Sequence, residues 1–288
     1  MVASDLLTRR LLATSDVGAA LALSDAAGWN QTADDWGFFI QHGRVLGVCN
    51  DDGQLVATAA ALPYGDGQAW ISMVLVNPAW QHRGLATGLL SETVEGLRKA
   101  GITPVLDATP AGEPVYRRLG FEPGLAFERW QAVLTTAGPS ESAAASRGAT
   151  VHAAGIGDID AIAALDLAAN GIHRRALLEA FMSRPGTRAW MTRGGSGFVL
   201  LREGRRATQI GPLVAADTPA AAALLDTALA ARAGPVFLDV ATRRDKLLAW
   251  LHDRGFSRQR PFVRMALGAV PALAGGNHQF IMAGPEFG

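Results

Sequence analysis

The sequence predicts an α+β protein built from two similar halves, each with a mixed, mostly antiparallel sheet flanked by helices. Short apolar segments typical of strands and longer segments typical of helices follow each other in both halves. In each half a long helix is followed by an apolar strand that ends near an aspartate, Asp107 or Asp239. A Gly-Phe pair comes next, Gly120-Phe121 or Gly255-Phe256, and this recurrence indicates a duplicated domain rather than a solenoid repeat.

The predicted domain limits follow from a segment that lacks large apolar residues. Residues 135–149, TTAGPSESAAASRGA, are small and polar, which is typical of a linker. The two domains are therefore predicted at residues 1–134 and 150–268. Residues 269–288 form a tail, in which the segment HQFIMA either adds a strand or stays loose.

Composition narrows the class of protein. Of 288 residues, 26 are basic and 26 are acidic, and this balance favours neither nucleic acid nor an anionic membrane as partner. The single cysteine, Cys49, lies in a strand-like segment where a buried structural thiol is expected, and the lack of disulfides fits a reducing compartment. No run is apolar and long enough for a membrane span or a signal peptide. We expect a cytoplasmic monomer or homodimer without a metal site.

The elements of the first half follow from local signals. Ser15-Asp16 is the expected cap of a first helix, and a loop rich in aromatic residues follows it. A long helix is expected to begin near Gly84, because an apolar stripe of helical period runs from Leu85 to Leu97. The expected strands are residues 44–50, 54–62, 69–76 and 103–108.

The second half repeats this order. Gly157-Asp158 is the expected cap of its first helix, and Thr218 that of its long helix, with Pro219 as the first helical residue. The pairs Arg174-Arg175 and Arg243-Arg244 are expected on solvated faces. The expected strands are residues 188–193, 197–203, 208–215 and 235–240.

The stretch NPAWQHRGLATGLL, residues 77–90, is typical of an anion site. Pro78 ends the preceding strand, since proline cannot donate to a ladder. The first N–H groups of the helix after Gly84 have no intrahelical partner and carry partial positive charge. Arg83 and His82 add side-chain donors, so the stretch is suited to a diphosphate. The alternative is a glycine-rich connection with an exposed arginine.

The segment QHRGLA, residues 81–86, resembles the Q/R-x-x-G-x-G/A signature of the GCN5-related N-acetyltransferase (GNAT) superfamily, which binds the diphosphate of acetyl-coenzyme A. The resemblance extends over about Leu6 to Gln131, with Ala86 at a glycine position and His82 where a small residue is usual. In that family the pantetheine arm lies where two parallel strands splay apart at a β-bulge, which places the bulge in Ile71–Val76. The implied coenzyme-binding residues are Val74, Leu75, Val76, Gln81, His82, Arg83, Gly84, Leu85, Ala86 and Thr87.

The resemblance also implies catalytic residues. Tyr116, four residues before Gly120, matches the general acid that protonates the leaving thiolate; alternatively it anchors the short helix. Asp107 ends its strand, where a carboxylate can act as general base; alternatively it caps the next helix, or a chain of waters takes the proton instead.

The acceptor amine is expected to meet the aromatic and acidic loop of the first half. Carboxylates and aromatic rings together can hold an amine. In the alternative, Trp36 and Phe38 belong to the core and the aspartates cap a second short helix. The candidate residues are Trp29, Asp34, Asp35, Trp36 and Phe38.

The second half is expected to be a degenerate copy that does not bind the coenzyme. Its strand-to-helix connection has no glycine cluster and no arginine, and Asp217 places a negative charge where a diphosphate would sit. Leu251 stands at the position that corresponds to Tyr116.

These patterns together predict an acetyl-coenzyme A-dependent N-acetyltransferase whose first half transfers acetyl to an amine, first of a small molecule and second of a protein. A coenzyme-binding sensor or interaction module without turnover is the alternative, and another acyl donor is a further one. A nucleotide phosphatase is excluded, because the G-K-[ST] motif and paired metal-binding carboxylates are missing.

Overall fold

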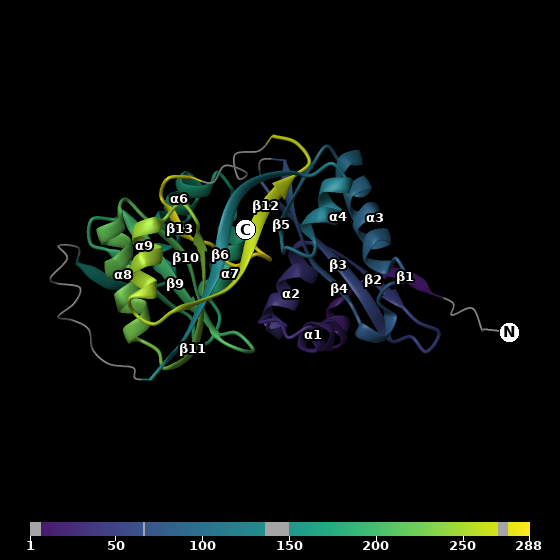
Figure 1. Cartoon of the computed structure of the whole chain (residues 1–288), viewed down its shortest axis with the longest axis horizontal. Coiled ribbons are helices and arrows are strands. Elements are labelled where there is room, and N and C mark those ends of the chain that lie inside the picture. Colours follow the sequence, from purple (N-terminus) through teal and green to yellow (C-terminus); the bar gives the residue numbers. More distant parts are fainter. Residues whose placement is uncertain (1–6, 66, 136–149, 270–275) are drawn as a thin grey trace. The chain divides into compact units, whose positions relative to one another are not determined.

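The computed structural model describes residues 7–65, 67–135, 150–269 and 276–288 (Figure 1). It divides into two compact units. Unit 1 holds the described residues up to Leu106 together with Phe287, and unit 2 holds those from Asp107 to Glu286 together with Gly288. Most of the predicted linker, residues 136–149, lies outside the described residues, and the predicted domain limits stay a prediction.

Unit 1 is a five-stranded sheet in the order β1-β2-β3-β4-β5. The neighbours β1 to β4 pair antiparallel, whereas β4 and β5 pair in parallel. Cys49 is buried at the end of β2. The strands are β1 (Thr8–Leu11), β2 (Arg44–Cys49), β3 (Leu55–Tyr64), β4 (Gln68–Val76) and β5 (Thr103–Ala108), whose last two residues belong to unit 2.

Helices cover both faces of the unit 1 sheet. One face carries α3 (Leu85–Lys99), and the other carries α1 (Val17–Ala26) and α2 (Ala33–His42), which pack on each other (Figure 1). On the α3 face, Leu85 and Leu89 pack against buried side chains of β2 and β3. Two short 3₁₀ turns, η1 (Thr14–Asp16) and η2 (Pro78–Trp80), precede α1 and α3.

Unit 2 contains an eight-stranded sheet in the order β12-β6-β11-β13-β10-β9-β8-β7. The strand β6, which the sequence places before the linker, pairs antiparallel with β11 on one side and β12 on the other. The only parallel pair that the described part of this unit shows is β10 with β11. The strands are β6 (Glu122–Leu134), β7 (Val151–Ala154), β8 (Arg188–Thr192), β9 (Gly197–Arg202), β10 (Thr208–Ala215), β11 (Gly234–Ala241), β12 (Ser257–Ala266) and β13 (Gln279–Ile281).

The helices of unit 2 begin at recognisable caps. Asp217 is the N-cap of α8 and accepts a hydrogen bond from the backbone N–H of Ala220 at 2.8 Å. The predicted cap, Thr218, is therefore one residue off and is the first helical residue. The helices are α4 (Glu113–Arg118), α6 (Ile159–Asn170), α7 (Arg175–Met182), α8 (Thr218–Ala230) and α9 (Asp245–His252), with the 3₁₀ turn η3 (Ile156–Asp158) before α6.

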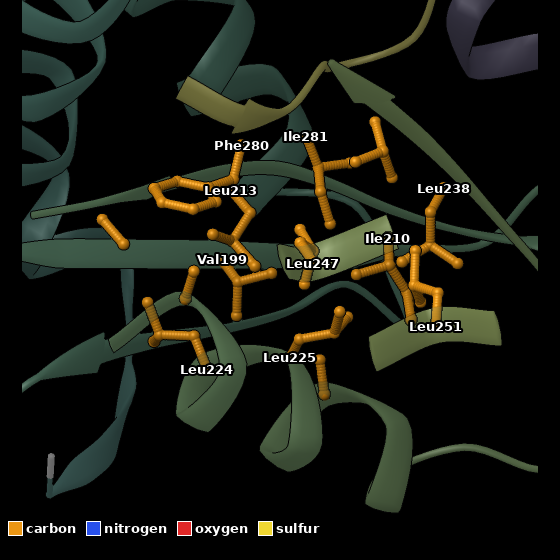
Figure 2. Packing of buried hydrophobic residues seen from close by; sticks show 14 of the residues in the cluster. Val199, Ile210, Leu213, Leu224, Leu225, Leu238, Leu247, Leu251, Phe280 and Ile281 are labelled. Atoms are coloured by element: carbon orange, nitrogen blue, oxygen red, sulfur yellow. The ribbon is translucent and has the colours of Figure 1, made fainter. Parts of the chain in front are cut away.

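The core of unit 2 lies between its sheet and the pair α8 and α9 (Figure 2). Leu224 and Leu225 of α8 and Leu247 of α9 meet the apolar side chains of β9, β10 and β11. Phe280 and Ile281 of β13 belong to the same cluster. Of the two alternatives for the tail, the structure therefore shows the added strand.

Buried ion pairs cross the interior of unit 2. In each, an arginine fork donates two hydrogen bonds to one carboxylate, and both side chains are at least 95 % enclosed. The expectation of a solvated face is wrong for Arg174, which lies inside and also donates to the carbonyl of Gly288. The pairs are Arg129–Asp239, Arg174–Asp166 and Arg264–Asp107.

Asp239 is the most heavily engaged of these carboxylates. Arg129 faces it across the β6–β11 ladder with both hydrogen bonds at 2.8 Å, and the side chain of Gln209 donates a third at 2.9 Å. Its exposed fraction is 0 %. A buried guanidinium that lost this partner would keep its desolvation penalty without compensation.

We predict that Asp239→Ala lowers the free energy of unfolding by about 3–5 kcal/mol, because it leaves the Arg129 guanidinium buried and unpaired. The double variant Asp239→Leu with Arg129→Met should recover most of this loss, since both charges are gone. Denaturant unfolding measures the difference. Lys99→Ala, which removes an exposed pair with Glu95, is the control and should change stability little. A single variant as stable as the control would contradict the prediction.

No helix of the described residues is both long enough and apolar enough to cross a bilayer.

Candidate functional site

The strand β4 carries an irregularity at Met73. The β4 register against β3 shifts between Ser72 and Leu75, and Met73 has a positive φ of 52° although it is not glycine. The hydroxyl of Thr58 donates to the Met73 carbonyl at 2.8 Å and holds this conformation inside the unit. A bulge adds a residue to one strand and bends it. The bulge expected within Ile71–Val76 is present.

The bulge lies where β4 and β5 stop pairing. The parallel register joins Gln68–Trp70 to Thr103–Val105, and the described residues show no further pair between the two strands. Leu75 and Val76 continue to pair with β3 on their other side. Backbone N–H and C=O groups of this stretch that point away from β3 can therefore hydrogen-bond to a ligand that contains amide groups.

The loop between β4 and α3 forms a left-handed turn at two positions. His82 and Gly84 have φ values of 62° and 77°, and residues 81–84 are exposed. A side chain on Gly84 would meet nothing within 4 Å, so conformation rather than space calls for glycine here. Successive N–H groups in such turns converge and form a concave anion-binding surface.

The start of α3 is left without a side-chain cap. Gly84 is its N-cap and makes no side-chain hydrogen bond, and the first intrahelical bond runs from Gly88 N–H to the Gly84 carbonyl at 2.9 Å. The N–H groups of Leu85, Ala86 and Thr87 therefore have no acceptor within the helix. Their partial positive charge favours an anion at this helix start.

Arg83 is placed beside this helix start by an aromatic ring. Its guanidinium carbon lies 4.5 Å from the centroid of the Trp80 ring, a cation–π distance. The side-chain amide of Gln81 donates to the Val76 carbonyl at 3.4 Å and links the loop to the end of β4. The predicted coenzyme-binding residues thus fall on one strand end and one helix start of unit 1.

Tyr116 lies on α4 in unit 2. Its ring packs against the backbone at Gly112 and lies 5.9 Å from the Phe121 ring, between centroids. Burial raises the pKa of its hydroxyl above the ordinary value of 10.0. The phenol therefore keeps its proton at neutral pH, as both an acid and an anchor would.

Asp107 is held in a buried ion pair. Arg264 of β12 donates to both its oxygens, at 2.9 and 3.1 Å, and neither side chain has exposed area. Burial raises the pKa of Asp107, and the charge and hydrogen bonds of Arg264 act against that rise. Asp107 is also not the cap of α4, whose N-cap is Gly112. Sequence reasoning missed Arg264, since nothing local connects it with Asp107.

Three of the five residues expected to contact the acceptor amine instead have structural roles, as the alternative interpretation predicted: Asp35 caps a helix, and Trp36 and Phe38 belong to the core. Asp35 forms a capping box with Thr32 at the start of α2, and its side chain accepts from the Thr32 N–H at 2.8 Å. Trp36 is fully buried and donates to the Ser24 hydroxyl at 2.9 Å, and Phe38 is 6 % exposed. Trp29 is partly buried and Asp34 is exposed, so these two keep surface that a ligand can reach.

Phe287 is a unit 1 residue that the sequence did not indicate. Its ring stacks on Phe39 of α2 with centroids 4.9 Å apart and planes 4° from parallel. The hydroxyl of Tyr64 donates to its carbonyl at 2.9 Å. Phe287 therefore supports α2 from a position near the end of the chain. The isolated aromatic of GPEFG was the only signal.

Family models match both halves of the chain. A model described as "Acetyltransferase (GNAT) family" matches residues 19–121, and one described as "Acetyltransferase (GNAT) domain" matches residues 162–280. No curated protein matches the chain.

Solved structures share the fold of almost the whole chain. A candidate acetyltransferase from Pyrococcus horikoshii has a TM-score of 0.81 at 21 % identity, over 98 % of this chain and 96 % of its own. A tandem GNAT protein from the clavulanic acid biosynthesis pathway has a TM-score of 0.65 at 19 % identity, over 92 % of this chain and 100 % of its own. A GCN5-related N-acetyltransferase from Sphaerobacter thermophilus has a TM-score of 0.62 at 18 % identity, over 90 % of this chain and 95 % of its own.

With one family model on each half and tandem structures that span both, the chain belongs to the GCN5-related N-acetyltransferase superfamily as a tandem of two GNAT domains.

Proposed function

We propose that the chain is an acetyl-coenzyme A-dependent N-acetyltransferase that acts through its N-terminal half on the amine of a small molecule. One observation carries the proposal: the bulge at Met73 and the uncapped start of α3 occur together on one strand–helix connection. The bulge leaves backbone groups of β4 that can hydrogen-bond to the amides of a ligand. The uncapped helix start leaves N–H groups that can bind an anion. Coenzyme A carries both amides, in its pantetheine arm, and an anion, its diphosphate.

Binding in this proposal uses main-chain donors more than side chains. The N–H groups of residues 84–87 hold the diphosphate, and Arg83 adds a positive charge beside them. Val74, Leu75 and Val76 offer backbone groups past the bulge to the amides of the pantetheine arm. Gln81 and His82 shape the turn, and His82 takes a positive φ to do so.

The coenzyme supplies the acetyl group as a thioester, which the amine attacks directly. In this proposal Tyr116 is the general acid for the leaving thiolate, a role that its protonated phenol permits. For the amine proton, the ion pair with Arg264 favours a positioning role of Asp107 over the role of base. The proton then passes to water, with Trp29 and Asp34 as the proposed contacts of the acceptor.

A panel of amines tests the proposal against the alternative of a sensor without turnover. Thiol release from acetyl-coenzyme A should increase with at least one small amine, and mass spectrometry should find that amine acetylated. Tight coenzyme binding without thiol release for small amines, peptide N-termini or lysine peptides would favour the sensor.

We predict that Arg83→Glu weakens acetyl-coenzyme A binding at low salt at least about tenfold, or about 1.4 kcal/mol, because it reverses a charge at the proposed diphosphate site. Arg98→Glu is the matched control, since it makes the same change at the exposed far end of the same helix. Isothermal titration calorimetry measures both. Equal affinities of the two variants would count against this site.

We predict that Tyr116→Phe lowers kcat about a hundredfold or more with little change in coenzyme affinity, because it removes a proton donor and keeps the ring. Steady-state kinetics and calorimetry separate the two effects. An equal loss of turnover and affinity would indicate the anchoring role instead.

We predict that any alkaline loss of kcat caused by Tyr116 occurs above pH 10. A general acid acts in its protonated form, and burial raises the Tyr116 pKa above 10.0, so the protonated form persists to higher pH. The pH profile of kcat measures this, with Tyr116→Phe as the control that lacks the titration. A Tyr116-dependent loss between pH 7 and 9 would contradict the prediction.

A further inference from the structure

Unit 2 contains a strand pair built like β4 and β5 of unit 1. The strands β10 and β11 pair in parallel over three residues, Thr208–Ile210 with Val236–Leu238, as β4 and β5 do. Each pair is followed by an irregularity in its first strand. In β4 it lies at Met73, and in β10 the register shifts between Ile210 and Leu213, with Gly211 at a φ of 141°.

In unit 2 the space past this irregularity is filled by the chain itself. The strand β13 stands between β10 and β11 in the sheet order and pairs antiparallel with both. Ile281 faces Leu213 on one side and Val240 on the other. The N–H of Met282 donates to the Asp239 carbonyl at 2.8 Å, and the His278 carbonyl accepts from the Ala215 N–H at 3.0 Å. Backbone groups on both sides of β13 thus hydrogen-bond to both diverging strands.

The side chains of β13 are as enclosed as those of the core. The exposed fractions of Phe280 and Ile281 are 2 % and 0 %, and both point into the cluster with Leu213 and Val199 (Figure 2). Gln279 is also fully buried, and neither polar atom of its side chain has a hydrogen-bond partner in the described structure. The side chains of this segment are therefore as withdrawn from solvent as those of the surrounding core.

Two arginines hold the carbonyls that lead into β13. Arg244 donates to the Gln279 carbonyl at 2.9 Å and to that of Asn277, and its guanidinium lies 4.0 Å from the Phe280 ring centroid. Arg243 donates to the Gly276 carbonyl. Both were expected on a solvated face. Arg243 is exposed as expected, whereas Arg244 is partly buried, and both donate to the tail.

The start of α8, which follows β10, has an N–H group that is hydrogen-bonded by a side chain of the protein itself. Asp217 caps α8 with its carboxylate, whereas the start of α3 has no side-chain cap. An anion at α8 would have to displace Asp217 and approach its charge.

We infer that the C-terminal segment Gly276–Met282 is a built-in peptide ligand of the second half, bound in the strand divergence that corresponds to the proposed pantetheine site of the first half. The inference rests on the proposed function, which gives that divergence its role. Together with Asp217, the segment closes unit 2 to coenzyme A, so each chain takes one coenzyme. Strand addition supplies affinity through main-chain hydrogen bonds, and buried side chains fix the register.

Hydrogen exchange on the full chain tests whether the segment is bound. The amides of Met282 and Ala215 should be protected to a similar degree with and without saturating coenzyme A. Fast exchange of these amides, or their loss of protection when coenzyme A is added, would overturn the inference. The protection of these amides in the coenzyme-free chain depends neither on activity nor on coenzyme binding.

Substitutions at Gln279 test the buried register. Gln279→Leu should raise the midpoint of thermal unfolding by about 2 °C or more and slow the exchange of Met282, because it removes two unpartnered polar atoms from the core. Gln279→Glu should lower the midpoint and speed that exchange. Asn277→Leu, at an exposed position of the same segment, is the control. A Gln279→Leu variant that behaves like the control would overturn the inference.

Coenzyme stoichiometry completes the test and separates the two proposals. The full chain should bind one coenzyme A, as measured by calorimetry and native mass spectrometry, and Arg83→Glu should weaken that single site. A second equivalent that Arg83→Glu leaves intact would overturn the inference. No binding at all, with Met282 still protected, would overturn the proposed function and leave the segment as the ligand of unit 2.

Discussion

Two diverging pairs of parallel strands leave backbone N–H and C=O groups that must find partners, and this requirement organises both halves of the protein. Unpaired backbone groups away from water destabilise a fold by an amount comparable to a lost hydrogen bond. In unit 2 the strand β13 meets the requirement. In unit 1 the corresponding stretch of β4, past Met73, has no partner from β5 among the described residues. The same strand design thus yields a filled site and a site suited to a ligand.

Buried charge fixes the register of strands that are distant in sequence. Arg129 and Asp239 lie opposite each other on β6 and β11, and their bidentate geometry fits one alignment of the two strands. A shift of one residue between the two strands would place the two charges on opposite faces of the sheet. The ion pair between Arg264 and Asp107 constrains the alignment of β12 with the end of β5 in the same way. Hydrophobic residues alone fill space, whereas these pairs select one pairing.

Local signals in the sequence predicted much of the fold and the elements that carry the candidate site, whereas partners far apart in the chain left no signal. The start of α3 at Leu85 was predictable because a glycine, a preceding proline and an apolar stripe lie within one short segment. The bulge at Met73 followed from the resemblance, since methionine has no preference for positive φ. Arg243 and Arg244 look like any basic surface pair until the carbonyls of the tail are placed beside them. The hydrophobic periodicity of a sequence identifies the apolar face of an element, but it does not identify the segment that packs on that face.

The two helix starts differ in whether a side chain occupies their first N–H groups, which separates the proposed anion site from a closed helix start. Gly84 gives α3 a left-handed cap without a side chain, so its N–H groups stay available and Arg83 adds charge of the favourable sign. Asp217 gives α8 a carboxylate that already occupies the Ala220 N–H and repels a second anion. Since the strand divergence beside α8 is also filled, an arginine introduced there would not be enough to create a coenzyme site. Expulsion of β13 would be needed as well, and that would return its buried apolar side chains to water.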